Sequence, residues 1–171
     1  SVREMKRPGR SRQEKLSAVR ALIRETGASA VLLTLLDDVA WVTNLRGDDV
    51  PNNPVFLANL LVNEKEAVLF LDAKRLSPGV EARLLEDGIS LASPENLLQV
   101  LRHWAKEWKI LLDPERTNAE FVQQVPAERL VCGASPVMML KCRKSPEEIA
   151  AICEAHERDA VALAEFYAEL D

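Results

Sequence analysis

Residues 28–62 have the sequence ASAVLLTLLDDVAWVTNLRGDDVPNNPVFLANLLV, and this stretch decides the fold. It opens with residues 30–35, a short continuous apolar run between turn-forming residues, which is typical of a strand buried on both faces. It closes with a second β-like run, residues 55–62, and a third run, residues 67–71, follows a short polar connection. Two such runs with a short polar connection predict a β-hairpin.

Short apolar strands alternate with amphipathic helices along the rest of the chain. Ser11 and Glu14 have the spacing of a capping box and predict a helix that Gly27 ends. Further strands are expected at residues 89–92, 109–112 and 129–132, and further helices at residues 77–87, 94–106 and 118–125. This alternation predicts an α/β fold with three α/β/α layers and a mixed, mostly parallel sheet of five or six strands.

Asp37 directly follows the first predicted strand. Acidic residues at the carboxyl end of a strand can bind Mg²⁺. The same position also suits the N-cap of a short helix that runs through Trp41. We expect capping, because no phosphoacceptor aspartate and partner lysine follow at matching strand ends.

The two ends of the chain differ in character. Basic residues dominate the start, and we expect residues 1–10 to be a disordered lead-in. Near the other end, Ser145-Pro146-Glu147-Glu148 combines an N-cap, a proline at the first helical position and a capping-box glutamate. The helix that follows runs to the last residue without a stop signal, so we expect its packing partner to lie beyond the chain. It carries one apolar stripe, formed by Ile149, Ile152, Cys153, His156, Ala160, Leu163, Tyr167 and Leu170.

Composition excludes several classes of protein. Hydrophobic residues at 47% and charged residues at 29% are typical of a folded domain rather than a disordered chain. The net charge of −5 argues against nucleic-acid binding, and no apolar run reaches the ~20 residues of a membrane span. Cys132, Cys142 and Cys153 form no CxxC pair, so we expect buried or incidental thiols in a reducing cytoplasm.

The residues show no catalytic constellation. A metal-dependent hydrolase needs several ligands that converge on one point, but the chain has two histidines, His103 and His156. The residues from His156 to Asp159 resemble the start of an HExxH motif and lack its second histidine. No GxSxG, GxGxxG or GxxxxGK motif is present. We therefore expect no catalytic residue and no bound metal or cofactor in this chain.

Two blocks of residues resemble a known family. Residues 11–62 resemble the middle domain of long-form Xaa-Pro aminopeptidases, a domain of the creatinase/prolidase N-terminal type. The first block matches at Glu14-Lys15, Arg20, Leu36-Asp37, Ala40-Trp41, Asn44 through Gly47, Asp49, and Asn53 through Phe56. The second block matches at Ser135-Pro136-Val137, Leu140-Lys141, Lys144, Glu148, Ala155-His156, Arg158-Asp159-Ala160 and Ala162-Leu163. Asp48 and Asn59 depart from the family pattern, which commonly has Ser and Tyr at these positions.

The resemblance implies a parent enzyme that removes an N-terminal residue preceding proline. Such an enzyme uses two divalent metals, typically Mn²⁺, whose ligands all lie in a C-terminal pita-bread domain. None of those positions exists here, so the resemblance implies that this chain alone is inactive. It divides the chain into the creatinase N-terminal-like domain, residues 11–144, and the end of the linker with the first helix of the pita-bread domain, residues 145–171. The implied partners are that missing domain, a peptide substrate and a second subunit in a homodimer.

In the family, domains of this type wall the active-site cleft and contribute to dimerisation. The polar loop, residues 44–56, is the candidate surface for these contacts. Its expected substrate- or subunit-facing residues are Arg46, Gly47, Asp48, Asp49, Asn53 and Pro54. The alternative is that Asp49 and Asn53 bond loop backbone groups and that Arg46 pairs locally.

Other functions remain open from the residues alone. Proteins with the same fold include Xaa-Pro dipeptidases and a creatine-cleaving hydrolase, and their distinguishing ligands would lie outside this chain. A stand-alone binding or scaffolding module is the third possibility, because the apolar stripe of the last helix favours self-association.

Overall fold

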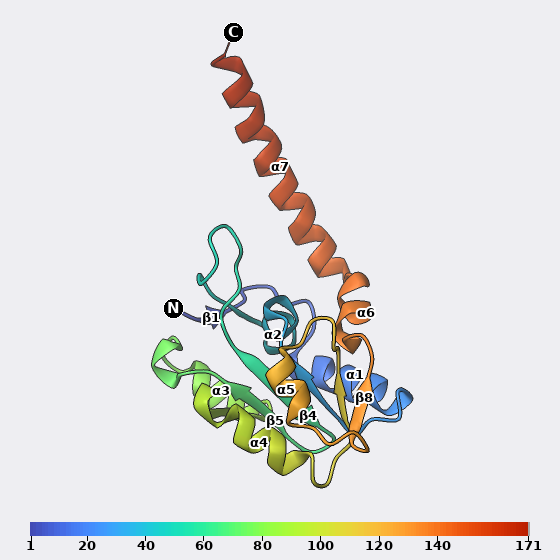
Figure 1. Cartoon of the computed structure of the whole chain (residues 1–171). Coiled ribbons are helices and arrows are strands. Elements are labelled where there is room, and N and C mark those ends of the chain that lie inside the picture. Colours follow the sequence, from blue (N-terminus) through green and yellow to red (C-terminus); the bar gives the residue numbers. More distant parts are fainter. Residues whose placement is uncertain (171) are drawn as a thin grey trace.

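The computed structural model describes residues 1–170 and contains a six-stranded sheet in the order β6-β5-β4-β2-β7-β8 (Figure 1). The strands are β2 (Ala30–Leu33), β4 (Asn59–Asn63), β5 (Ala67–Phe70), β6 (Ile89–Ala92), β7 (Ile110–Leu112) and β8 (Leu130–Cys132). The predicted hairpin is confirmed as β4 and β5, which pair antiparallel with Val62 opposite Ala67. β4 also pairs antiparallel with β2, and the remaining three pairs of strands are parallel. The prediction of a mixed, mostly parallel sheet is therefore confirmed.

Helices cover both faces of this sheet. They are α1 (Arg12–Glu25), α2 (Leu36–Thr43), α3 (Val80–Glu86), α4 (Leu97–Trp104), α5 (Ala119–Gln123), α6 (Pro136–Cys142) and α7 (Pro146–Ala168), with short 3₁₀ turns at Ala73–Arg75 and Pro94–Asn96. Side chains alternate between the faces of a strand, so β2 contributes to two separate cores. Val31 and Leu33 pack with α1, α2, α3 and α6, whereas Ala30 and Leu32 pack with α4 and the end of α5.

The first residues of the chain are ordered, and the prediction of a disordered lead-in is wrong. A short strand, β1 (Arg3–Glu4), pairs antiparallel with β3 (Leu45–Arg46), which opens the polar loop. Val2 is fully buried in the larger core, and its backbone bonds to Arg75 and Ser77. The charged residues of this segment suggested disorder, but a buried apolar side chain, a two-residue ladder and the ion pairs of Glu4 hold it against the domain.

Two details of α2 also differ from the expectation. The helix begins at Leu36, Leu35 occupies the N-cap position, and no side chain caps it. Asp37 therefore lies inside the first turn instead of at the cap. A carboxylate in that turn still interacts favourably with the helix dipole.

The last helix projects away from the domain (Figure 1). Ser145 and Glu148 form the predicted capping box, and the helix runs to Ala168 with no buried residue. Its exposed large apolar residues are Ile149, Ile152, Val161, Leu163, Phe166, Tyr167 and Leu170. Among residues 1–170, no helix is long and apolar enough to cross a membrane.

Candidate functional site

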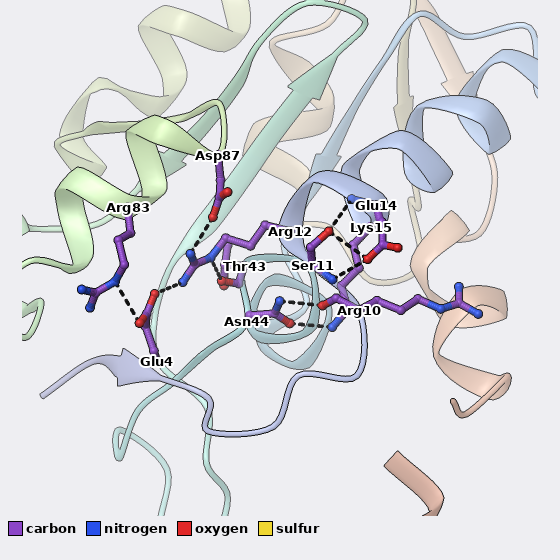
Figure 2. Close-up of polar contacts among 10 residues, drawn as sticks. All are labelled: Glu4, Arg10, Ser11, Arg12, Glu14, Lys15, Thr43, Asn44, Arg83 and Asp87. Carbon is purple, nitrogen blue, oxygen red and sulfur yellow. Dashed lines mark hydrogen bonds and ion pairs between the residues drawn. The ribbon is translucent and has the colours of Figure 1, made fainter. Parts of the chain in front are cut away.

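The polar loop starts from a left-handed residue. Asn44 ends α2 with φ 54°, a conformation that asparagine tolerates because its short side chain can bond locally. Its amide nitrogen donates to the carbonyl of Arg10 at 2.9 Å, and its Oδ1 accepts from Lys15 Nζ at 2.6 Å (Figure 2). The start of the loop is thereby joined both to α1 and to the segment that precedes it.

Arg46 points back into the domain. Its guanidinium donates to the carbonyls of Ala40 at 2.8 Å and Leu45 at 2.7 Å, and lies 3.1 Å from the sulfur of Met5. It does not pair with Asp49. These contacts favour the local role of Arg46, in which it holds the end of α2 against the N-terminal segment.

Asp49 also supports the loop backbone. Its carboxylate accepts from the N–H of Leu57 at 2.6 Å and pairs with Arg75. The bond from Leu57, followed by that from Arg75, holds the pKa of Asp49 below its usual value. Gly47 has a steric role, because a Cβ there would lie 2.6 Å from Cβ of Phe56.

The other half of the loop is open to solvent. Asp48, Asn53 and Pro54 are exposed, and Asp48 pairs with the amino group of Ser1 at 2.8 Å. The six predicted site residues therefore divide into two groups. Arg46, Gly47 and Asp49 shape the loop, and Asp48, Asn53 and Pro54 form its accessible face.

A charged network joins the N-terminal segment to the domain (Figure 2). Arg12 is almost fully buried and donates to Glu4 at 2.6 Å, to Asp87 at 2.7 Å and to the carbonyl of Thr43. Arg83 adds a second bond to Glu4 at 2.9 Å. Burial raises the pKa of Glu4, but the bonds from Arg12 and Arg83 outweigh burial and lower it overall. Sequence reasoning missed this network, because the partners of Arg12 are 8, 31 and 75 residues away along the chain.

A second network that the sequence did not predict connects α2 to α6. Asp38 is 0% exposed and accepts from Ser135 Oγ at 2.5 Å and from Lys141 Nζ at 2.7 Å. Lys141 also bonds to Asp37. Burial opposes the charge on Lys141, but the two carboxylates outweigh burial and raise its pKa. Asp37 and Asp38 are thus held by a lysine, and the magnesium alternative finds no support in this geometry.

The crevice at the carboxyl ends of β2, β7 and β8 is where open α/β domains commonly bind ligands. Asp38, Asp113, Thr117 and Ser135 line it. The hydroxyl of Thr117 has no hydrogen-bond partner within residues 1–170. The crevice has about 10 Å³ available to the centre of a water molecule, which is room for one water and excludes a peptide.

The remaining candidates for chemistry are scattered. His103 on α4 and His156 on α7 are both exposed. The three cysteines are free and exposed as well, so of the two alternatives, buried or incidental thiols, the structure excludes burial. Within the described chain, no three His, Cys, Asp or Glu side chains converge as metal ligands would. These residues do not fit a dinuclear metal centre.

The fold and these contacts define a three-layer α/β domain whose charged networks join distant segments. The chain belongs to the creatinase/prolidase N-terminal domain family, whose model matches residues 1–148. It is 32% identical over 169 residues to Xaa-Pro aminopeptidase 1 of Dictyostelium discoideum, covering 98% of this chain and 27% of that relative.

Solved structures show the same relationship. An X-prolyl aminopeptidase of Caenorhabditis elegans, described as a cytosolic enzyme with a di-nuclear active site, has a TM-score of 0.93 and 27% identity. The match covers 99% of this chain and 29% of that one. A Xaa-Pro dipeptidase of Bacillus anthracis shares the fold, with a TM-score of 0.60, 16% identity, and coverage of 82% of this chain and 38% of the dipeptidase. The chain thus spans between a quarter and two fifths of these proteins.

Proposed function

We propose that this chain is a non-catalytic domain of a longer Xaa-Pro aminopeptidase. The observation that carries the proposal is the similarity along the whole chain to enzymes of that name, of which the chain represents little more than a quarter. The hydrolytic chemistry, supplied by two divalent metals such as Mn²⁺, would belong to the part of the parent outside this chain. The parent would act in the cytoplasm, in keeping with the cytosolic enzyme of similar structure.

The proposed boundary lies at the start of α7. Residues up to about 144 form the α/β domain, and residues 145–171 connect it to a pita-bread domain and supply that domain's first helix. The exposed apolar stripe of α7 supports this division, because such a surface favours burial against a partner. The start of the domain is earlier than residue 11, since β1 is part of its fold.

The accessible face of the polar loop is the part of this domain that would reach the substrate cleft or a second subunit. Asp48, Asn53 and Pro54 are exposed. Asn53 and Pro54 support the loop through their backbone, because Asn53 bonds to Val50 and Val55 and the carbonyl of Pro54 accepts from Gly47. In this way the domain would shape substrate access and dimerisation without contributing a catalytic group.

Two assays test the proposal. The 171-residue chain with Mn²⁺ and an Xaa-Pro peptide should show no turnover, whereas the full parent should release the N-terminal residue. Turnover by the chain at a rate comparable to that of the parent would overturn the assignment of the chemistry to the missing part.

Substitutions in the full parent test the loop. Asp48→Ala and Asn53→Ala should lower kcat/KM or weaken the dimer while leaving stability unchanged. Asp49→Ala serves as the contrast, because it should lower stability through the lost bonds to Leu57 and Arg75. If Asp48→Ala and Asn53→Ala change neither activity nor assembly, the loop has only a local role.

A Xaa-Pro dipeptidase is the second candidate, because the fold is shared with such an enzyme. Substrate length separates the two. An aminopeptidase parent would cleave both Xaa-Pro dipeptides and longer Xaa-Pro peptides, whereas a dipeptidase would cleave the dipeptide alone.

A further inference from the structure

Helix α7 has no buried residue, yet its first turns contact the N-terminal segment of the chain. Gly9 packs against the capping box, and a Cβ at this position would lie 2.6 Å from Ser145 Oγ and 3.1 Å from Cγ of Glu148. Gly9 also has φ +70°, a conformation that favours glycine. The N-terminal segment and the start of α7 therefore fit together only because residue 9 lacks a side chain.

An ion pair extends this contact along the helix. Arg7 donates from one nitrogen to both carboxylate oxygens of Glu154, at 2.8 and 2.9 Å. Glu154 lies about two turns beyond the capping box, so the pair fixes a second point along the helix. Both side chains are more than half exposed, so the ion pair should add little to stability. Its effect is to orient α7 relative to the domain.

The first turn of α7 also carries a negative charge that favours a buried ammonium of the domain. Lys15 is 1% exposed, and within residues 1–170 its hydrogen-bond partners are Asn44 Oδ1 and the carbonyl of Trp41 rather than a carboxylate. Burial lowers the pKa of Lys15, Glu148 on α7 opposes this effect, and Arg46, Arg10 and Arg12 reinforce it. Glu148 is thus the nearby negative charge that favours the buried ammonium, and it lies in the first turn of α7.

We propose that Arg7 and Gly9 form a seat that fixes the direction in which α7 leaves the domain. The two contacts that Arg7 and Gly9 make define the helix axis at its base. Arg7 and Gly9 are positioning residues for whatever follows α7. Only the consequence that the seat places the catalytic part of a peptidase rests on the proposed function.

The chain carries suitable probes for a test. Cys132 on β8 and Cys153 near the base of α7 are both free and exposed, so nitroxide labels can be attached after Cys142→Ser removes the third thiol. Pulsed electron paramagnetic resonance then measures the distance distribution between the two labels. Dilution of the labelled protein with unlabelled protein removes any contribution from association between copies.

Two matched glycine variants separate the seat from ordinary backbone strain. Gly27 has φ +77°, close to the value at Gly9, but nothing lies within 4 Å of a Cβ placed there. Gly9→Ala should at least double the width of the distance distribution or shift its mean, whereas Gly27→Ala should leave it unchanged. Equal distributions in the two variants would overturn the proposal.

A charge exchange provides a second arm in case Gly9→Ala fails to fold. Arg7→Glu should broaden the distribution, and Arg7→Glu combined with Glu154→Arg should restore it. Failure of the combined variant to restore a width that the single variant increased would also count against the seat. Neither test measures peptidase activity. The result of each is therefore independent of whether the parent is an aminopeptidase.

Discussion

Lys15 shows how one buried charge can be accommodated without a salt bridge. Its ammonium lies 2.6 Å from Asn44 Oδ1, 3.0 Å from the carbonyl of Trp41 and 4.3 Å from the centre of the Trp41 ring. Two acceptors and a cation–π contact replace part of the lost hydration. The replacement is incomplete, since burial still lowers the pKa of Lys15 to about 8.

This lowered pKa predicts a specific dependence of stability on pH. Between about pH 8 and 10.5 the unfolded chain holds the proton of Lys15 more often than the folded chain does, so the contribution of Lys15 to the free energy of unfolding rises with pH. The rise should not exceed about 3 kcal/mol. Urea unfolding of the wild type and of Lys15→Met at several pH values gives the difference between the two proteins. A difference that stays constant from pH 7 to 10.5 would contradict this account.

Lys141 allows a second prediction at the residue scale. Lys141→Met removes the cation bonded to the buried carboxylate of Asp38, and should lower the free energy of unfolding by about 3 kcal/mol. Adding Asp38→Asn should recover much of that loss, because the uncompensated charge is then gone. Lys65→Met, in the exposed hairpin turn, is the control and should change stability by less than about 0.5 kcal/mol. A loss in Lys141→Met no larger than in this control would show that Asp38 does not depend on the lysine.

At the scale of elements, the sequence predicted those structures whose signals are local. The capping boxes at Ser11 and Ser145 place the starts of α1 and α7 correctly. The β4–β5 hairpin is also confirmed, because Asn63 Oδ1 accepts from the N–H groups of Lys65 and Glu66 and so stabilises the turn. Each of these features is determined by residues within a few positions of one another.

Elements that depend on distant contacts were not predicted. β1 and β3 are two residues each, and they form only because they pair across some 40 positions. The same limit applies to the candidate site. Arg46 and Asp49 are close in sequence, yet Arg46 bonds to carbonyls of α2 and β3 while Asp49 bonds to Arg75. The contacts of the loop therefore required the tertiary structure.

The stripe of α7 predicts self-association of the 171-residue chain. Leu163→Glu places a charge on the stripe, and should raise the dissociation constant of a dimer at least tenfold, or about 1.4 kcal/mol. Val161→Glu is a matched control, because residue 161 is also exposed but lies 200° around the helix from residue 163, on the side away from the stripe. Analytical ultracentrifugation measures both. A wild type that is monomeric at high concentration, or equal weakening by both substitutions, would contradict this role of the stripe.

At the scale of the whole molecule, residues from both ends of the domain pack in one hydrophobic core. Val2 and Val137 belong to the same cluster, which runs along one face of the sheet from α1 to α6. Opening either end exposes apolar surface of the other, so residues 2–142 should unfold as a unit. α7 contributes nothing to either core and lies outside that unit.

Hydrogen exchange can measure this division directly. The part of α7 beyond the contact with Arg7, residues 155–168, has the length at which an isolated helix is marginal in water, about 12–15 residues. Its amides should therefore open with free energies below about 2 kcal/mol. Amides of β2 and β4 should open with the global free energy of unfolding, about 5–15 kcal/mol. The first two turns, which touch the seat, should lie between these values.

The Leu163→Glu background makes that experiment decisive, because it suppresses association that would protect the helix from exchange. Protection of the last turns of α7 equal to that of β4 in this variant would mean that the helix packs on its own domain, and would contradict its placement outside the cooperative unit. Rapid exchange in the chain and slow exchange in a full-length parent would instead locate the stabilising partner of α7 in the remainder of the protein. The same helix would then be marginal or rigid according to whether that partner is present, since its stripe is its main source of tertiary stability.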